Sequence, residues 1–261
     1  MKKVTTIGEV VTFLDSIFHP ELQEDYDNAG FLLGDSSTAY HGALVALDLT
    51  PAVIEEATVQ GLNLIVTHHP FIFSGLKRIT DRTEAGRMTI TLIHNGIAAY
   101  SAHTNLDNLP WGVNGILSEK LGLKGCRILK GEETGAGMVG ELPRAMEADK
   151  FLLRVKELTG QPSLRTSKHD PKRKVKRVAL CGGAGSFLIG DAIAAKADIF
   201  LTADLKYHDF QRAEGRLVLA DAGHYETEQF AKEIISRAIS EKFSNFACRI
   251  SQTQGSLVQY I

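Results

Sequence analysis

The chain reads Leu64-Ile65-Val66-Thr67-His68-His69-Pro70, so an apolar run that predicts a buried strand ends in two imidazoles. Neighbouring side chains on extended backbone point to opposite sides, and the two rings can share one metal ion only where the backbone bends. On a straight backbone, each ring would bind an ion of its own. The alternative is a capping or hydrogen-bonded pair of histidines, and the residues at the other predicted strand ends decide between the two.

Length and composition are those of a globular protein with one large domain or two ordinary ones. The 261 residues are 44% hydrophobic, which is enough to bury a sizeable core. Charges nearly balance, with 29 Lys and Arg against 31 Asp and Glu, so the overall field does not attract nucleic acid or an anionic membrane. Glu9 and Asp15 interrupt the first apolar positions, which argues against a signal peptide or membrane span and predicts a cytoplasmic location.

The three cysteines, Cys126, Cys181 and Cys248, are odd in number and far apart in the sequence. They form no Cys-x-x-Cys pair, which argues against a disulfide framework and against a structural zinc site. We therefore expect buried, reduced thiols.

One pattern of elements occurs twice along the chain, after a predicted amphipathic helix over 7–18 and a turn and short strand within 27–35. The first copy predicts strand, helix, strand, helix and strand over 43–47, 51–60, 64–67, 84–95 and 97–101. The second copy predicts the same order over 175–180, 187–195, 199–202, 207–213 and 216–220. Apolar strands with short connections favour right-handed crossovers onto parallel sheets. The predicted fold class is α/β, with two similar α/β domains and mainly parallel sheets.

The boundary between the predicted domains falls in the glycine-rich stretch 121–141, which suits a linker or a β-rich connection. We place the domains at 1–125 and 126–261, with the final helix and strand as candidates to pack back on the first domain. A polar stretch, 161–174, is typical of an exposed loop. The basic residues within 172–177 either touch phosphates or form a solvated sheet edge, and the sheet edge is the more common case.

Ligands in parallel α/β sheets bind beyond the carboxyl ends of the strands, and three of the predicted strands end in metal-binding residue types. The residues that follow these strands are His68 and His69, His103 and Asp107, and Asp221, His224 and Glu228. His224 and Glu228 are spaced i,i+4 where helical character begins, so one helix face can present both to one ion. Each fragment alone is a weak signal, but their joint position favours a metal site.

Five of these residues form the predicted ligand set, namely His68, His69, Asp107, His224 and Glu228. One catalytic ion needs fewer ligands, and a bridging carboxylate can hold two ions roughly 3.5–4 Å apart. We therefore predict two divalent metal ions per subunit, and mixed imidazole and carboxylate ligands suit zinc, manganese or iron. A water between two cations becomes hydroxide near neutral pH. His103 is the candidate catalytic proton shuttle, and a hydrogen bond that orients a ligand is the equally favoured alternative.

The glycine-rich segment 181–186 follows a predicted strand and precedes a predicted helix. It matches neither the dinucleotide fingerprint nor the P-loop, because a third glycine and a Gly-Lys-Ser or Gly-Lys-Thr are missing. Its amides could hold a substrate phosphate or carboxylate, or its glycines could serve a tight turn. Asp204, Lys206, Tyr207 and His208 are candidates to line the same cavity, or ordinary residues of a helix start.

The motifs together resemble the NIF-three-like family of dinuclear-metal proteins, the type 2 homologues of GTP cyclohydrolase I. The matching stretches cover nearly the whole chain and are Asp27-Asn28-Ala29-Gly30, Thr67-His68-His69-Pro70, 101–107, 181–186, 202–208 and 223–228. The resemblance implies that the two divalent metals are bound by His68, His69, Asp107, His224 and Glu228. It also implies two α/β domains with the metal site in the cleft between them, and a ring-shaped homohexamer.

The leading functional hypothesis is a metal-dependent hydrolase of nucleotide-like substrates, similar to a GTP cyclohydrolase, in which metal-bound hydroxide attacks a ring carbon or a phosphorus. A second enzyme hypothesis keeps the metals and changes the bond to a phosphoester or an amide. The alternative is a non-catalytic metal-binding or DNA-encircling hexameric ring, with 172–177 as its local support. The near-zero net charge disfavours nucleic acid as a partner, and no membrane partner is expected.

Overall fold

The computed structural model describes residues 4–213, 215–259 and 261, and the chain divides into two compact units. The first unit combines the chain up to Leu106 with Ala231–Gly255, and the second combines Asp107–Phe230 with the residues from Ser256 onward. The predicted boundary at 125/126 lies inside β5 (Lys124–Gly131). The division between the two units falls before this predicted boundary, because α5 (Val113–Lys120) packs on β5, β6 (Gly135–Glu147) and β8 (Lys174–Ala184) of the second unit.

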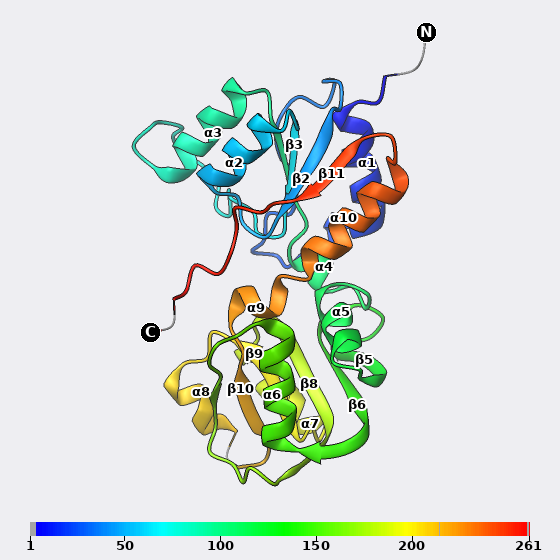
Figure 1. Ribbon diagram of the computed structural model, residues 1–261, viewed down its shortest axis with the longest axis vertical. Coiled ribbons are helices and arrows are strands. Elements are labelled where there is room, and N and C mark those ends of the chain that lie inside the picture. Colours follow the sequence, from blue (N-terminus) through cyan, green and yellow to red (C-terminus); the bar gives the residue numbers. More distant parts are fainter. Residues whose placement is uncertain (1–3, 214, 260) are drawn as a thin grey trace. The chain divides into compact units, whose positions relative to one another are not determined.

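A five-stranded sheet forms the centre of the first unit, in the order β1-β4-β3-β2-β11 (Figure 1). The strands are β1 (Gly30–Leu33), β2 (Gly42–Ala46), β3 (Leu64–Thr67), β4 (Ala98–Ser101) and β11 (Ala247–Ile250). All neighbours pair in parallel except β1, which runs antiparallel to β4. The helices are α1 (Ile7–Phe18), η1 (Pro20–Leu22), α2 (Pro51–Val59), α3 (Glu84–His94) and α10 (Ala231–Lys242). The predicted alternation of strands and helices from β2 to β4 is confirmed.

Helices cover both faces of this sheet, which is why its central strands are buried throughout. All residues of β2 and β3 are buried. Leu44 and Ile65 belong to the core cluster that α2 and α3 complete on one face, and α1 and α10 lie on the other face (Figure 1). The hydroxyls of Thr50 and Thr83 accept the backbone N–H groups of Val53 and Gly86, and these caps begin α2 and α3.

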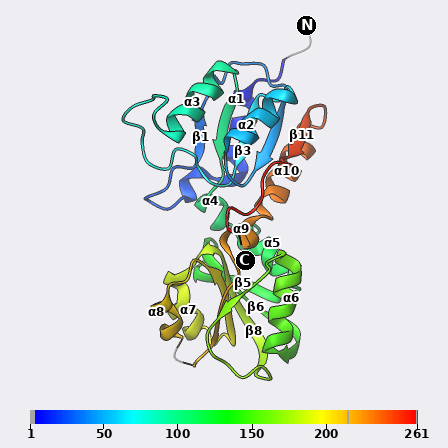
Figure 2. The ribbon, with the colours of Figure 1, turned by 60° about the vertical axis from the view of Figure 1, so that its left-hand side comes forward.

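The second unit contains a six-stranded sheet in the order β5-β6-β8-β9-β10-β7 (Figure 2). Its other strands are β6 (Gly135–Glu147), β7 (Arg165–Thr166), β8 (Lys174–Ala184), β9 (Ile199–Ala203) and β10 (Val218–Asp221). Its other helices are α6 (Ala148–Thr159), η2 (Ser186–Leu188), α7 (Ile189–Ala194), α8 (Tyr207–Arg212) and α9 (His224–Glu228), and α4 (Thr104–Asp107) ends at the division between the units. The predicted order from β8 to β10 is confirmed. Helices α7 and α8 lie on one face of this sheet and α6 on the other (Figure 2).

The mainly parallel character predicted for both sheets holds for the first sheet and for part of the second. Strands β8, β9 and β10 pair in parallel, whereas β5, β6 and β7 pair with their neighbours antiparallel. For β5 and β6 the reason is the short turn between Gly131 and Gly135, because strands joined by so few residues can pair only as an antiparallel hairpin.

Within the described part of the chain, none of the helices combines the length and the apolar character needed to cross a membrane.

Cys126, Cys181 and Cys248 are free cysteines. Cys181 is buried as expected, whereas Cys126 and Cys248 are only half-buried.

We expect Ile65→Ala to lower the free energy of unfolding of the first unit by about 2–5 kcal/mol, because the cavity it leaves between sheet and helices collapses only partly. Chemical denaturation followed by circular dichroism measures this change. Val59→Ala, at an exposed position on α2, is the control and should change stability by less than about 0.5 kcal/mol. Equal losses in the two variants would contradict this packing.

Candidate metal centre

The two imidazoles after β3 lie side by side because the backbone bends where the strand ends. The N–H groups of His68 and His69 both donate to the Leu47 carbonyl, at 3.1 and 2.9 Å. The Thr67 hydroxyl donates to the His69 carbonyl at 2.8 Å and closes the bend. The two ring centroids are consequently 5.0 Å apart. This is the bend that the sequence requires if both rings are to reach one ion.

His103, which follows β4, brings a third imidazole to the same part of the first unit. Its ring centroid is 5.3 Å from that of His68 and 5.5 Å from that of His69. The three side chains offer ring nitrogens that all lie within 4.8 Å of one another. The first unit therefore contains a compact group of imidazole ligands, which we call the imidazole cluster.

In each imidazole of the cluster, Nδ1 faces a hydrogen-bond acceptor. The nitrogen left for a metal ion is therefore Nε2. The Nδ1 atoms of His68, His69 and His103 lie 2.7, 2.6 and 2.7 Å from the Ala102 carbonyl, the Asp48 carboxylate and the Asp27 carboxylate. Carbonyl and carboxylate oxygens only accept, so in a neutral ring Nδ1 carries the proton and Nε2 keeps the lone pair that binds a metal. The donor atoms therefore fit a divalent cation.

Asp27 presents a buried carboxylate to His103. Burial by itself would raise the pKa of this carboxyl, but hydrogen bonds from His103 and Thr104 outweigh it and lower the pKa to about 2. Its Oδ2 accepts the Thr104 backbone N–H at 3.1 Å and also the Thr104 hydroxyl, while Oδ1 accepts the Asn28 N–H and faces His103. At neutral pH Asp27 therefore presents a negative charge to Nδ1 of His103.

The second unit contains an imidazole and three carboxylates of the predicted site region, namely His224, Asp107, Asp204 and Glu228. His224 Nε2 lies 3.0 Å from Glu228 Oε2 on α9, as the i,i+4 spacing predicts. His224 Nδ1 lies 2.7 Å from the Asp204 carboxylate, the same kind of pairing as in the first unit. Asp107 and Glu228 offer ligand oxygens within 4.8 Å of each other. Burial and then these two carboxylates raise the pKa of the Cys181 thiol, which keeps its proton.

Gly183 makes room for the Glu228 carboxylate. Its φ is +58°, and a Cβ at this position would overlap Glu228 Oε1. The Gly183 N–H donates to the Thr227 hydroxyl, and the Gly183 carbonyl accepts the Thr202 hydroxyl, both at 3.0 Å. Two roles are predicted for the segment 181–186, namely amides that hold an anion or glycines that the backbone conformation requires. These contacts support the second role for Gly183.

Asp221 and the basic stretch 172–177 contribute contacts that hold the second unit together. Asp221 accepts the Leu205 N–H at 3.1 Å and pairs with the Arg165 guanidinium. The partners of the basic side chains are the Gly215 and Arg216 carbonyls for Arg173, Glu147 for Lys174, and Glu141 for Lys176 and Arg177. These contacts favour a solvated polar surface over a nucleic-acid surface, but β8 is an interior strand and not the sheet edge that the sequence predicts.

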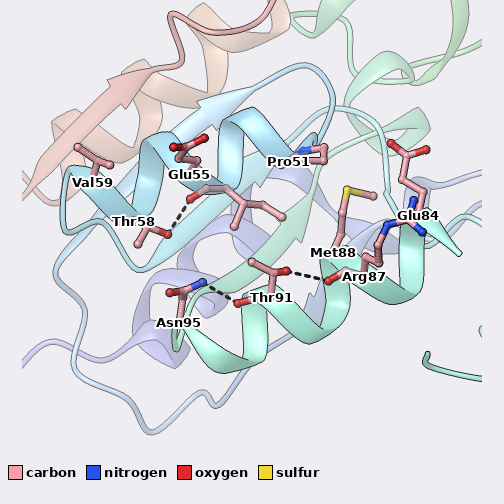
Figure 3. Close-up of a pocket in the computed structure, with 10 residues that line it drawn as sticks. Pro51, Glu55, Thr58, Val59, Glu84, Arg87, Met88, Thr91 and Asn95 are labelled. Atoms are coloured by element: carbon pink, nitrogen blue, oxygen red, sulfur yellow. Dashed lines mark hydrogen bonds between the residues drawn. The ribbon is translucent and has the colours of Figure 1, made fainter. Parts of the chain in front are cut away.

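A groove of about 570 Å³ lies elsewhere in the first unit, between α2 and α3 (Figure 3). Its lining includes Ile54, Val59 and Met88. The hydroxyls of Thr58 and Thr91 donate to carbonyls of their own helices, at 2.8 and 2.9 Å, rather than to a ligand. The groove shares no residue with the imidazole cluster, which is the candidate metal site of this unit.

Sequence reasoning does not connect the carboxylates Asp27, Asp48 and Asp204 to the imidazoles that they contact. Asp48 follows the predicted strand 43–47, so the strand-end signal that selects His68 could have found it. For Asp204 the sequence predicts only a place in the lining of the cavity beside 181–186, or an ordinary helix start. Asp27 lies 76 positions from His103 in a turn, and no spacing in the sequence links the two.

Comparison with known proteins gives one family and several close structural matches. The profile of the family described as Duf34/NIF3 (NGG1p interacting factor 3) matches residues 5–256. A relative from Clostridium perfringens, named GTP cyclohydrolase 1 type 2 homolog, is 35% identical over 246 residues, which cover 92% of this chain and 93% of the relative. A hypothetical protein from Staphylococcus aureus has a crystal structure that matches with a TM-score of 0.91 and 28% identity, covering 99% of this chain and 100% of that one. A Bacillus cereus protein related to NIF3 has the same fold, with a TM-score of 0.93 and 23% identity over 100% of both chains.

We expect Gly183→Ala to destabilise the second unit by about 1–3 kcal/mol, because alanine is strained at this positive φ and its methyl group overlaps Glu228. Gly190→Ala is the matched control, since a Cβ on this residue of α7 meets no atom within 4 Å. Alanine favours a helix more than glycine does, so the control should be neutral or slightly stabilised. Thermal unfolding compares the two, and equal melting temperatures would contradict the close approach of Glu228.

Proposed function

Because the chain belongs to the Duf34/NIF3 family, we propose that its two units together bind two divalent metal ions and hydrolyse a nucleotide-like substrate. The proposed ligands are His68, His69, Asp107, His224 and Glu228. The observation that carries the proposal is the imidazole cluster, whose Nε2 atoms are set as acceptors by the partners of Nδ1. Zinc, manganese and iron(II) suit this mixture of imidazole and carboxylate ligands.

Divalent ions, when bound, lower the pKa of a coordinated water to roughly 7 and polarise the bond under attack. The chain itself orients the ligands and moves the proton. Ala102 and Asp48 hold the rings of His68 and His69 through Nδ1. We assign His103 the transfer of a proton at Nε2, with Asp27 stabilising its charged form.

Exposed aromatic side chains beside His103 support a planar heterocycle as the substrate. Tyr26 and Phe73 are exposed, and their ring centroids are 6.3 Å apart. The Phe73 ring centroid is 6.1 Å from that of His103. The Asn28 amide donates to the Ile72 carbonyl at 2.6 Å and joins the two loops that carry these rings. Exposed aromatic rings of this kind stack on bases, which fits a nucleotide.

With GTP as the substrate, we expect one water to attack the imidazole carbon of guanine and open the ring to a formamide, and a second water to hydrolyse the formamide and release formate. Formate release by metal-reconstituted protein measures this reaction, and phosphate release measures the alternative attack at a phosphorus. His68→Ala should lower the rate by more than roughly 100-fold, since even a residue behind a metal ligand contributes 10–100-fold. His94→Ala, on the exposed side of α3, is the matched control and should retain the wild-type rate.

Two outcomes of this assay speak against the proposal. Equal product from His68→Ala and wild type would remove the cluster from the reaction. A lack of turnover across nucleotides, phosphoesters and amides, with metal still bound, would leave the non-catalytic metal-binding role. Product from a phosphoester or an amide alone would keep the hydrolase and change the bond.

The metal content is expected to be two divalent ions per chain in protein purified without chelator. Elemental analysis measures the content before and after dialysis against a chelator, which should remove both ions together with the activity. One ion per chain would contradict the dinuclear centre. A homohexamer and a cytoplasmic location, both expected from the sequence, stay predictions.

A further inference from the structure

Residues 251–254, which we name the C-terminal strap, contact Asp48, whose carboxylate in turn contacts His69. They follow β11, and the Glu56 carboxylate on α2 holds them in place. Glu56 accepts the hydroxyls of Ser251 and Thr253 at 2.7 and 3.0 Å, and the backbone N–H groups of Gln252 and Thr253 at 3.2 and 3.3 Å. One carboxylate thus fixes three successive residues and sets the position of the fourth, Gln254.

The side-chain amide of Gln254 has only one orientation that satisfies its partners. The Leu47 N–H can only donate, so the atom that it meets at 2.5 Å is the oxygen Oε1. The nitrogen Nε2 therefore points the other way. It donates to the Asp48 backbone carbonyl and to Asp48 Oδ2, both at 3.1 Å.

Asp48 is consequently held on both sides. Its Oδ2 accepts the Gln254 amide, and its Oδ1 lies 2.6 Å from His69 Nδ1. A carboxylate without the first contact can rotate and present either oxygen in a range of directions, because the torsion that turns a carboxylate is broad. With it, Oδ1 is aimed at His69. The Leu47 carbonyl also accepts the His69 N–H, so the backbone and the ring of His69 are oriented from the same segment.

We propose that Gln254 is a positioning residue of the metal centre, which acts through Asp48 to fix the tautomer and direction of the His69 ring. This inference rests on the proposed function, because it assumes that His69 binds a metal ion. It assigns a role in the site to a residue 206 positions from Asp48 in the sequence. A role limited to anchoring the chain end would change stability and leave metal binding unaltered.

The test compares Co²⁺ binding by the full-length wild type, Gln254→Ala and Gln254→Glu. Glutamate keeps an oxygen for the Leu47 N–H but cannot donate to Asp48, so it separates docking of the strap from orientation of Asp48. Both variants should bind Co²⁺ about 10-fold more weakly, and the visible absorption of bound Co²⁺ should change with the ligand geometry. Gln252→Ala is the matched control, because its side chain donates to the Ile250 carbonyl instead, and it should keep the wild-type affinity and spectrum.

The variant His69→Ala distinguishes failure of this inference from failure of the proposed function. If His69→Ala loses Co²⁺ while Gln254→Glu keeps the wild-type affinity and spectrum, Gln254 has no positioning role and the metal centre stands. If wild type and His69→Ala bind Co²⁺ equally, both ideas are overturned. A lower melting temperature of Gln254→Ala with unchanged affinity and spectrum would also overturn the positioning role.

Discussion

The peptide unit that carries the Leu47 carbonyl is the constraint on which the imidazole cluster depends. This one oxygen accepts the N–H groups of both His68 and His69, so the chain turns as soon as β3 ends. On a straight strand the two side chains would point to opposite faces of the sheet, and one ring would enter a helix layer. The turn converts two neighbours in sequence into two rings that face the same space. The third ring, from β4, can join them because β3 and β4 are parallel neighbours that end at the same edge.

The kind of acceptor that faces Nδ1 of each histidine depends on how deeply the ring is buried. His68 is fully buried, and its Nδ1 faces a neutral carbonyl, that of Ala102. The exposed fractions of the other side chains are 23% for His69, 16% for His103 and 38% for His224, and each of these rings faces a carboxylate. A charge beside a ring without solvent access is expensive, so the neutral acceptor occurs where burial is complete. Asp27 is the exception that is buried itself, and hydrogen bonds from Thr104 and Asn28 compensate its charge.

Local patterns in the sequence predict much of the fold and the residue types of the site. The bounds of α1 and β3 agree with the prediction, because capping residues, Pro20 and apolar spacing are all local signals. The hairpin of β5 and β6 is less visible, since its glycines resemble a linker and its burial follows no simple alternation. The histidines at strand ends can be found from the sequence, because the carboxyl ends of parallel strands lie at the same edge of a sheet. The contacts of Asp48 with His69 and Gln254 join residues 21 and 206 positions apart, and such distant pairs leave no periodic signal in one sequence.

The order of the chain places a whole unit between two parts of another. Strand β11 pairs in parallel with β2, and α10 packs beside them, so β2 becomes an interior strand only when residues 231–255 return to the first unit. The carboxyl end of β2 leads directly to Leu47 and Asp48, the residues that orient both histidines. The imidazole cluster is therefore supported by residues that follow the whole stretch 107–230 in the sequence. The entropy of closing a loop grows only slowly with its length, so an intervening unit of more than a hundred residues, 107–230, adds little to the cost of this closure. The same long separation makes the pairing of β11 with β2 a non-local contact, which forms more slowly than the contacts within β2, α2 and β3.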